Sequence, residues 1–332
     1  MMNKQTKWIL WIVLIVFLAV LPKFAGIYHT NVFLNFAIFS VFAVSVNMLL
    51  GFTRLLSFGH AAYFGLGAYG TALALRHIDG IGLLTAIGSG VLLAIAFGLL
   101  VCPIVVRVSG AAFAMVHLAF GQLMYILALR LRNVTGGEDG IGRFPVPPLE
   151  IPGIVSIPIF RQPENFYYLA IVILLLTLIF MWHFTKTPFG QVQAGIRDNP
   201  GRIDYIGFKV PQTKAIIYVV SAACAGIAGA IYVLFLNSVS PGGVFHILVH
   251  FTPIVAAVLG GMGSFFGPIL GMGLYLLVEE IALTFTNKVE LIMGVMLVGM
   301  VMFAPLGVVG IIKSLRQRIF PSSVNTVVEK NS

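Results

Sequence analysis

Residues 82–106, GLLTAIGSGVLLAIAFGLLVCPIVV, decide the fold class of this chain of 332 residues. The run contains no charged side chain and exceeds the roughly 20 apolar residues that a helix needs to cross a bilayer. Similar runs recur along the chain, in which 59% of the residues are hydrophobic, 9% are charged and the mean hydropathy is +1.02. Because a helix satisfies its own backbone groups in lipid, the sequence predicts an all-α, polytopic transmembrane helical bundle.

The apolar runs predict about 10 spans, with 8 as the alternative. The predicted spans are residues 8–27, 32–50, 58–75, 82–106, 111–131, 167–185, 215–237, 247–262, 265–286 and 289–312. The count is least certain between residues 247 and 287, where Pro253 and Pro268 interrupt a segment that barely holds two crossings. Lys4 and Lys7 before the first run resemble a secretory signal, but no small-residue cleavage site follows, so we expect a retained first helix.

The positive charge is sorted between the two sides of the membrane. The net charge is +9, and alternating the loops places most of the 20 Lys and Arg residues on the side of the N-terminus. Cytoplasmic loops carry such an excess, so both termini are predicted to be cytoplasmic and no nucleic-acid partner is needed to explain the charge. The inner cations are Lys4, Lys7, Arg54, Arg107, Lys186, Arg197, Arg202, Lys209, Lys214, Lys313, Arg316, Arg318 and Lys330.

The spans and loops form one predicted domain, residues 1–312, followed by a cytoplasmic tail, residues 313–332. The longest outer loop, residues 133–166, is rich in Gly and Pro and should form turns at the surface. The longest inner loop, residues 186–214, is unusually rich in charge and contains GIRDNPGRIDYIGFKV at residues 195–210.

The inner loop carries two helix starts. Thr187 and Asn199 each precede a proline, which is the arrangement of an N-cap followed by proline in the first turn. The apolar positions of the two predicted helices are Phe189, Val192 and Ile196, then Ile203, Tyr205 and Ile206. One reading is a solvated connector whose cations only set the topology. The other is a docking element, because a partner groove accepts a helix with one apolar face and a charged rim.

Five ordered motifs carry a family resemblance. They are GFTRLLSFGHAAYFGLGAY (51–69), LAFGQ (118–122), TGGEDGI (135–141), GIRDNP (195–200) and AAVLGGMGSFFGPILG (256–271). Together they resemble the LivM-type permease subunit of bacterial branched-chain amino-acid ABC importers, from about residue 50 to 310. LGGMGSFFGP is the most specific of them.

The resemblance implies a multi-pass protein of the bacterial inner membrane that is not itself an enzyme. Its implied partners are a related permease subunit in a heterodimer, two cytoplasmic ATPases and a periplasmic substrate-binding protein. The resemblance also implies that the inner loop is the surface that couples to the ATPase. The residues expected there are Phe189, Val192, Ile196, Arg197, Asp198, Asn199, Pro200 and Arg202.

The chain departs from the family pattern in three places. Thr53-Arg54-Leu55 replaces small residues and a glutamine, Glu138-Asp139 makes the outer TGG turn more acidic, and Gly195 replaces a more common alanine. Related permeases handle urea or short amides, so the substrate stays open within the family.

The sequence predicts no cofactor or metal in this chain. It contains no Gly-Lys dipeptide and therefore no GxxxxGK[ST] phosphate loop, so ATP must be used by a partner subunit. GLGAYG, at residues 65–70, matches GxGxxG only within a span, where small residues favour close helix packing. Cys102 and Cys224 fall inside spans, and His246 and His250 lack a third ligand nearby.

Glycines at intervals of four dominate the last motif. Gly263, Gly267 and Gly271 would share one face of a helix that Pro268 should kink. The face serves either close packing or gating. Gating predicts that Gly267→Leu abolishes transport in an assembled complex, whereas packing predicts that assembly itself is lost.

Polar side chains inside the spans are candidates for the translocation pathway because their burial in lipid is costly. They are Asn47, His60, His117, Gln122 and Tyr125, and the spacing places His117, Gly121 and Tyr125 on one helix face. The structural alternative is hydrogen bonding between helices.

Two functions of other classes remain as alternatives. An ion-coupled secondary carrier would use Glu279 or Glu280 as a proton relay. A membrane-embedded transferase would use His60, but no acid-base partner is evident beside it in the sequence.

Overall fold

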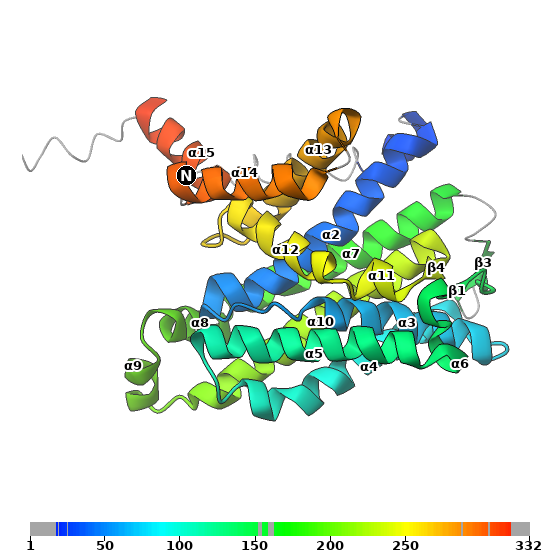
Figure 1. Cartoon of the computed structure of the whole chain (residues 1–332), viewed down its shortest axis with the longest axis horizontal. Helices are drawn as coiled ribbons and strands as arrows, with labels where there is room; N and C mark the ends of the chain where they lie inside the picture. Colours follow the sequence, from blue (N-terminus) through cyan, green and yellow to red (C-terminus); the bar gives the residue numbers. More distant parts are fainter. Residues whose placement is uncertain are drawn as a thin grey trace, which may run out of the picture.

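The computed structural model describes residues 18, 20–24, 26–151, 155–158, 163–286, 288–304 and 306–319. Its longer helices, labelled as in Figure 1, are α2 (Gly26–Thr53), α3 (Ala61–His77), α4 (Leu83–Val105), α5 (Gly110–Arg130), α7 (Pro163–Lys186), α8 (Pro188–Asp198), α10 (Val210–Leu236), α12 (Ile247–Gly260), α13 (Gly267–Phe285), α14 (Val289–Phe303) and α15 (Gly307–Ile319). Shorter elements are α6 (Arg132–Thr135), η1 (Gly137–Asp139), β1 (Ile141–Gly142), β2 (Leu149–Ile151), β3 (Val155–Ile157), α9 (Pro200–Tyr205), β4 (Ser238–Val239) and α11 (Pro241–Val244).

The described helices form the all-α polytopic bundle that the hydropathy predicts. Seven helices are long and apolar enough to cross a membrane, and α14 with α15 adds an eighth if this bent pair is one span. Helix α3, over the predicted span 58–75, has only 17 residues. The predicted first span, residues 8–27, lies mostly outside the described residues. The described part of the chain therefore accounts for the class but not for the count of ten.

Small residues set the spacing at the centre of the bundle, where α3 packs between α4 and α10. A Cβ atom added at Gly67 would overlap the backbone of Gly226 on α10, and one added at Gly70 would lie 2.7 Å from the Cα atom of Gly90 on α4. Within the GLGAYG stretch, glycine thus lets backbones touch, in agreement with the packing interpretation.

The longest predicted inner loop and the longest predicted outer loop lie at opposite ends of the bundle, as the predicted alternation of loops across the membrane requires. Helices α8 and α9 lie at one end, and α6 with the strands lies at the other (Figure 1). There β1 of the 133–166 loop pairs antiparallel with β4, with Ile141 opposite Val239, while β2 and β3 form a separate hairpin. Two loops predicted on the outer side therefore meet.

The glycine-rich motif is a turn between two helices, so the prediction of one kinked, glycine-faced helix is wrong. Helix α12 ends at Gly260, and α13 begins at Gly267. Gly263 lies in the turn, and Pro268 occupies the first turn of α13. Proline is favoured there because the amide hydrogen it lacks has no partner within the helix, so it starts α13 instead of kinking it.

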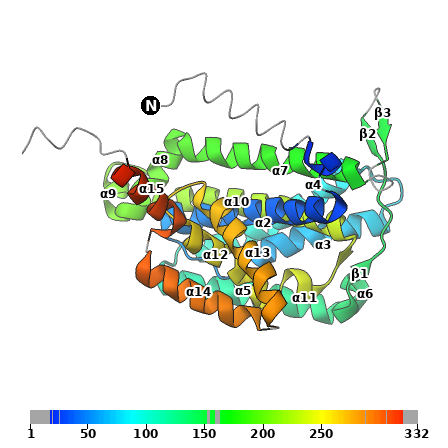
Figure 2. The ribbon, with the colours of Figure 1, turned by 90° about the horizontal axis from the view of Figure 1, so that it is seen from above.

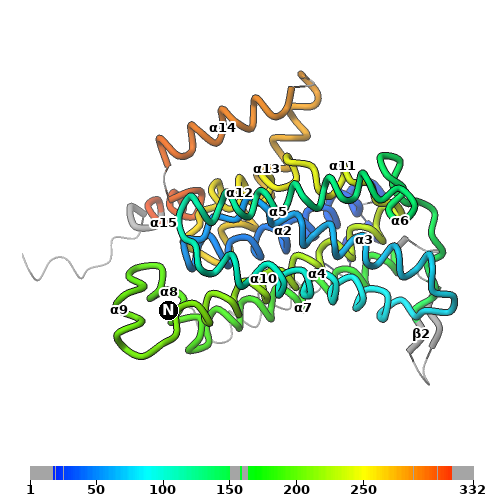
Figure 3. Tube along the Cα trace, turned by 60° about the horizontal axis from the view of Figure 1, so that its bottom comes forward, coloured from blue at the N-terminus to red at the C-terminus, as the bar shows by residue number. Residues whose placement is uncertain are grey.

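The last predicted span is broken. Helices α14 and α15 are bent by 44° relative to each other. Helix α14 contacts the bundle through α12 and α13, and it lies on the side opposite α7 (Figures 2 and 3). Much of its apolar surface is exposed in the isolated chain, including Leu291, Val295 and Met302.

Candidate functional site

His60 is part of a buried hydrogen-bond chain between α2, α3 and α10. The Ser221 hydroxyl donates to the carbonyl oxygen of Ser45 at 2.6 Å and lies 3.1 Å from Nε2 of His60. Because its only hydrogen is used, Ser221 accepts from Nε2 of His60, and Nδ1 of His60 lies 3.3 Å from the hydroxyl of Ser57. These contacts place a hydrogen on Nε2 and give His60 a structural hydrogen-bonding role.

His117 of α5 meets two tyrosines in the core. Its Nε2 lies 2.6 Å from the hydroxyl of Tyr218 and 3.3 Å from that of Tyr63, and the two hydroxyls also contact each other. Nδ1 of His117 is buried without a hydrogen-bond partner. Gly121, which the spacing places on the same face of α5, packs against Gly59. The ring of Tyr125, on that face as well, contacts the ring of His246 edge-on.

His246 and His250 have different hydrogen-bonding roles and are not arranged as a metal-binding pair. His250 is fully buried: its Nδ1 accepts from the amide of Ala61 at 3.2 Å, and its Nε2 lies 3.1 Å from the carbonyl oxygen of Phe245. His246 is the N-cap of α12. Among the described residues, no group of three or more His, Cys, Asp or Glu side chains could hold a metal ion.

In the described part of the chain, the other two polar candidates form no hydrogen bond with the histidines, and one of them bonds to the glycine-rich turn. Asn47 is fully buried on α2, and its Nδ2 donates to the carbonyl oxygen of Ser264 in the glycine-rich turn at 3.2 Å. Oδ1 of Asn47 and Nε2 of Gln122 are buried without hydrogen-bond partners. Asn47 therefore ties α2 to the turn between α12 and α13.

A cavity of about 510 Å³ opens between α2, α12, α13 and α14, in the half of the bundle that faces the predicted outer side. Its wall is mostly apolar and includes Leu248, Val249 and Leu276. Two carboxylates, Glu279 of α13 and Glu290 of α14, also line it. An apolar hollow with a few polar groups is the usual form of a small-molecule site.

Sequence reasoning considered Glu279 but missed Glu290. The two residues flank the short break between α13 and α14, so consecutive antiparallel spans bring them to the same end of the bundle. Their spacing in the sequence could therefore have predicted that Glu279 and Glu290 lie near each other. Glu280, by contrast, is exposed and accepts a hydrogen bond of 2.7 Å from the hydroxyl of Tyr28.

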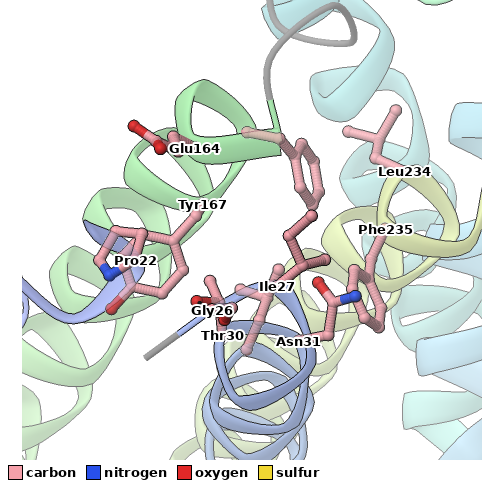
Figure 4. Close-up of a pocket in the computed structure, with 11 residues that line it drawn as sticks. Pro22, Gly26, Ile27, Thr30, Asn31, Glu164, Tyr167, Leu234 and Phe235 are labelled. Atoms are coloured by element: carbon pink, nitrogen blue, oxygen red, sulfur yellow. Dashed lines mark hydrogen bonds between the residues drawn. The ribbon is translucent and has the colours of Figure 1, made fainter. Parts of the chain in front are cut away.

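A second outer cavity, of about 320 Å³, lies where the first turns of α2 and α7 approach the end of α10. Tyr167 of α7 and Ile27 and Thr30 of α2 surround the open space, with Phe235 of α10 on its far side (Figure 4). The cavity opens on the end of the molecule that carries β1 and β4.

The inner loop folds as the caps predict. The hydroxyl of Thr187 accepts from the amide of Gly190 at 3.3 Å, and Oδ1 of Asn199 accepts from the amide of Arg202 at 3.1 Å. Helices α8 and α9 begin at the prolines that follow these caps. Both capped helices are therefore confirmed.

The apolar face of α8 is directed into its own bundle, not outward. Ile196 is only 2% exposed, the ring of Phe189 packs at a tilt against that of Phe184, and α8 packs against α2, α7 and α10. Val192 is partly buried. The face that sequence reasoning assigned to a partner groove thus anchors α8.

Arg197 joins α8 to the inner end of α2. Its Nη1 donates to the carbonyl oxygen of Gly51 at 3.1 Å, and its Nε lies 3.5 Å from a carboxylate oxygen of Asp198. Gly51 in turn packs against the carbonyl group of Met262 in the glycine-rich turn. A displacement of α8 would therefore act directly on α2 and on the turn between α12 and α13.

Helix α9 and the turn that follows it carry exposed apolar side chains. Tyr205 is 95% exposed, Ile206 64% and Phe208 46%. Ile203 folds back on Gly195, where an added Cβ atom would lie 2.5 Å from the end of its side chain. Gly195 thus makes room for α9 on α8.

The polytopic bundle of apolar helices and the small-residue packing between them are those of a multi-pass membrane protein. Residues 28–306 match the family described as branched-chain amino acid transport system / permease component. The chain belongs to this family.

Curated relatives carry the corresponding names. The chain is 29% identical over 289 residues to the high-affinity branched-chain amino acid transport system permease protein LivM of Escherichia coli, covering 81% of this chain and 67% of that protein. It is 24% identical to BraD of Pseudomonas aeruginosa, covering 82% and 91%, respectively. It is 22% identical to a probable LivM of Methanocaldococcus jannaschii, covering 80% and 84%. No solved structure matches the chain significantly.

Proposed function

We propose that this chain is the permease subunit of an ATP-binding-cassette importer and forms part of the pathway for leucine, isoleucine and valine across the bacterial inner membrane. The family match over residues 28–306 carries the proposal. A related permease subunit, two ATPases and a periplasmic binding protein complete the complex. The chain itself binds no nucleotide, and urea, short amides or other amino acids are the alternative substrates.

The inner end supports coupling to an ATPase. Helix α9 and the three residues that follow it expose Tyr205, Ile206 and Phe208, apolar and aromatic side chains of the kind that anchor protein interfaces. The contact between Arg197 and Gly51 carries a movement of the inner loop into the spans. We therefore assign docking to α9 and transmission to α8.

The outer cavity with Glu279 and Glu290 supports an amino-acid substrate. An amino acid presents one ammonium group and one carboxylate, and a branched side chain adds an apolar body. The two carboxylates suit the ammonium group, and Leu248, Val249 and Leu276 suit the side chain. Because a binding protein selects the substrate first, weak contacts suffice here.

Uptake in membrane vesicles tests the proposal. Vesicles that contain the co-expressed complex and ATP but no ion gradient should accumulate leucine when the binding protein is supplied. An ATPase subunit should co-purify with this chain. Uptake that follows an imposed proton gradient and ignores ATP would overturn the importer.

Glu279→Gln combined with Glu290→Gln is expected to lower leucine uptake about 10- to 100-fold. The variant removes a charge-assisted contact with the substrate ammonium, and such contacts contribute about 1.5–3 kcal/mol. Initial rates of ATP-driven uptake measure the effect. Glu280→Gln is the control, since it removes a carboxylate charge next to Glu279 at an exposed position outside the cavity wall, and should leave uptake nearly unchanged. Equal losses in both would contradict a substrate contact.

The same carboxylates keep an ion-coupled carrier as a second candidate. Glu279 lines a cavity within the predicted membrane region, as a proton-relay carboxylate would. Under that function, Glu279→Gln abolishes proton-driven uptake but not exchange of internal for external substrate. Under the importer, both fall together and remain dependent on ATP.

A further inference from the structure

A separate cavity lies at the inner end of the bundle and collects positive charge. Its volume is about 480 Å³, and it is lined by the end of α2, the glycine-rich turn, α8 and the first turns of α15. Arg54, Arg197 and Lys313 contribute to its wall. These three cations are far apart in the sequence, and the charge distribution independently assigns all three to the cytoplasmic side.

The guanidinium and ammonium groups retain free capacity for an anion. Arg197 uses Nη1 for the carbonyl oxygen of Gly51, while its buried Nε makes no hydrogen bond and only approaches Asp198. The side chain of Asp198 is 69% exposed, and Asp198 is not among the residues that line the cavity. Several donors on three side chains therefore face the cavity without an acidic residue in its wall.

The backbone conformation determines where two of these cations, Arg54 and Lys313, lie. Arg54 has φ +55°, a left-handed conformation that is uncommon for residues other than glycine, directly after α2 ends. Lys313 is exposed on α15, a helix with one apolar and one charged face.

The rim of the cavity is apolar. Met262 is 37% exposed and Leu306 74%, and both line the cavity. Ile311, Ile312 and Leu315 of the adjoining α15 are also exposed. A helix with exposed apolar residues beside cations is typical of the membrane interface. A ligand that fits this surface has an anionic head and an apolar body.

We propose that this cavity binds the phosphate headgroup of an anionic phospholipid of the cytoplasmic leaflet, with an acyl chain along Leu306 and α15. Basic pockets between spans on the cytoplasmic side take such headgroups. The bound lipid would contact α2, α8, the glycine-rich turn and α15, all of which contribute to the wall of the cavity. The cytoplasmic orientation rests on the charge distribution, and the site does not depend on the transported substrate.

Lipid titration of the purified full chain in a mild detergent tests the site. Phosphatidylglycerol is added, bound lipid is counted by native mass spectrometry, and phosphatidylcholine serves as the comparison without net charge. Arg54→Gln with Lys313→Gln is expected to weaken phosphatidylglycerol binding about 30-fold, because each cation near a membrane surface contributes about a factor of five. Lys313→Gln alone, at an exposed helical position, should fold normally and weaken binding about fivefold.

Arg107→Gln with Lys209→Gln is the matched control. Both residues are exposed and predicted on the cytoplasmic side, and neither lines the cavity. This variant should bind phosphatidylglycerol as the unmodified chain does. An equal loss in the control would reduce the effect to general surface charge and overturn the site.

Two further arms separate other occupants. If inorganic phosphate at millimolar concentration displaces the lipid completely, the cavity is a site for free anions and the lipid proposal is wrong. If a carbodiimide joins Lys313 to a carboxylate of the co-purified ATPase in intact membranes, the occupant is a protein side chain and the proposal is also wrong. The lipid-binding measurement does not depend on transport. If the vesicles show no ATP-driven uptake, the proposed function fails, but the result for the lipid site still stands.

Discussion

Tyr205→Asp combined with Phe208→Asp is expected to release the ATPase from the membrane complex and to lower ATP-driven uptake more than 100-fold. Tyr205 is 95% exposed, so its side chain contributes almost nothing to the packing of the bundle, and Phe208, just after α9, is 46% exposed. Burying a charge in an apolar contact is strongly unfavourable, and truncation of a central aromatic anchor alone costs about 2–4 kcal/mol in protein interfaces. The measurements are co-purification of the ATPase and uptake in vesicles.

Arg197→Gln is the companion variant that separates docking from transmission. It removes the charged donor to the carbonyl oxygen of Gly51 but leaves the exposed side chains of α9 in place. The ATPase should still co-purify and hydrolyse ATP, while uptake falls. Exchange of the two charges in Arg197→Glu with Asp198→Lys should have the same effect. If the aspartate variant keeps its ATPase and transports normally, the inner loop only sets the topology.

Hydropathy predicted the class of the fold because transfer of apolar residues into lipid depends on composition more than on detailed packing. The caps of α8 and α9 were also predictable, since Thr187, Asn199 and the prolines after them act within a few residues. The 17-residue α3 and the bend between α14 and α15 were not predicted, because a hydropathy window averages over local breaks.

The direction of a helix face proved harder to predict than its existence. The spacing of Phe189, Val192 and Ile196 correctly gives a one-sided α8, but periodicity does not say whether the partner is the same chain or another one. Ile196 is buried by the chain itself, whereas Tyr205 is left exposed. For the same reason, sequence patterns alone do not distinguish a pathway role from a packing role for His60, whose neighbours Ser57 and Ser221 contact both ring nitrogens.

The glycine-rich turn suggests a variant with an equally large effect on assembly. Gly271→Ala is expected to lower the free energy of unfolding by about 3 kcal/mol, and Gly271→Leu by more, because overpacking against backbone forces helices apart. A Cβ atom at this position would overlap the carbonyl oxygen of Ala256 and lie 2.6 Å from the amide nitrogen of Gly260. Neither backbone group can rotate away as a side chain can. Thermal unfolding of the detergent-solubilised chain and recovery of assembled complex measure the loss.

Gly263→Ala is the matched control from the same motif, since no atom lies within 4 Å of its added Cβ. It should unfold and assemble like the unmodified chain. Gly267→Leu should behave like Gly271→Leu, because a Cβ atom at Gly267 would overlap the carbonyl oxygen of Gly261. Loss of assembly in both variants is what packing requires. A Gly267→Leu complex that assembles and hydrolyses ATP but does not transport would instead indicate that the turn between α12 and α13 moves during transport. The contacts of Asn47 and Gly51 would then transmit the movement of the inner loop to this turn.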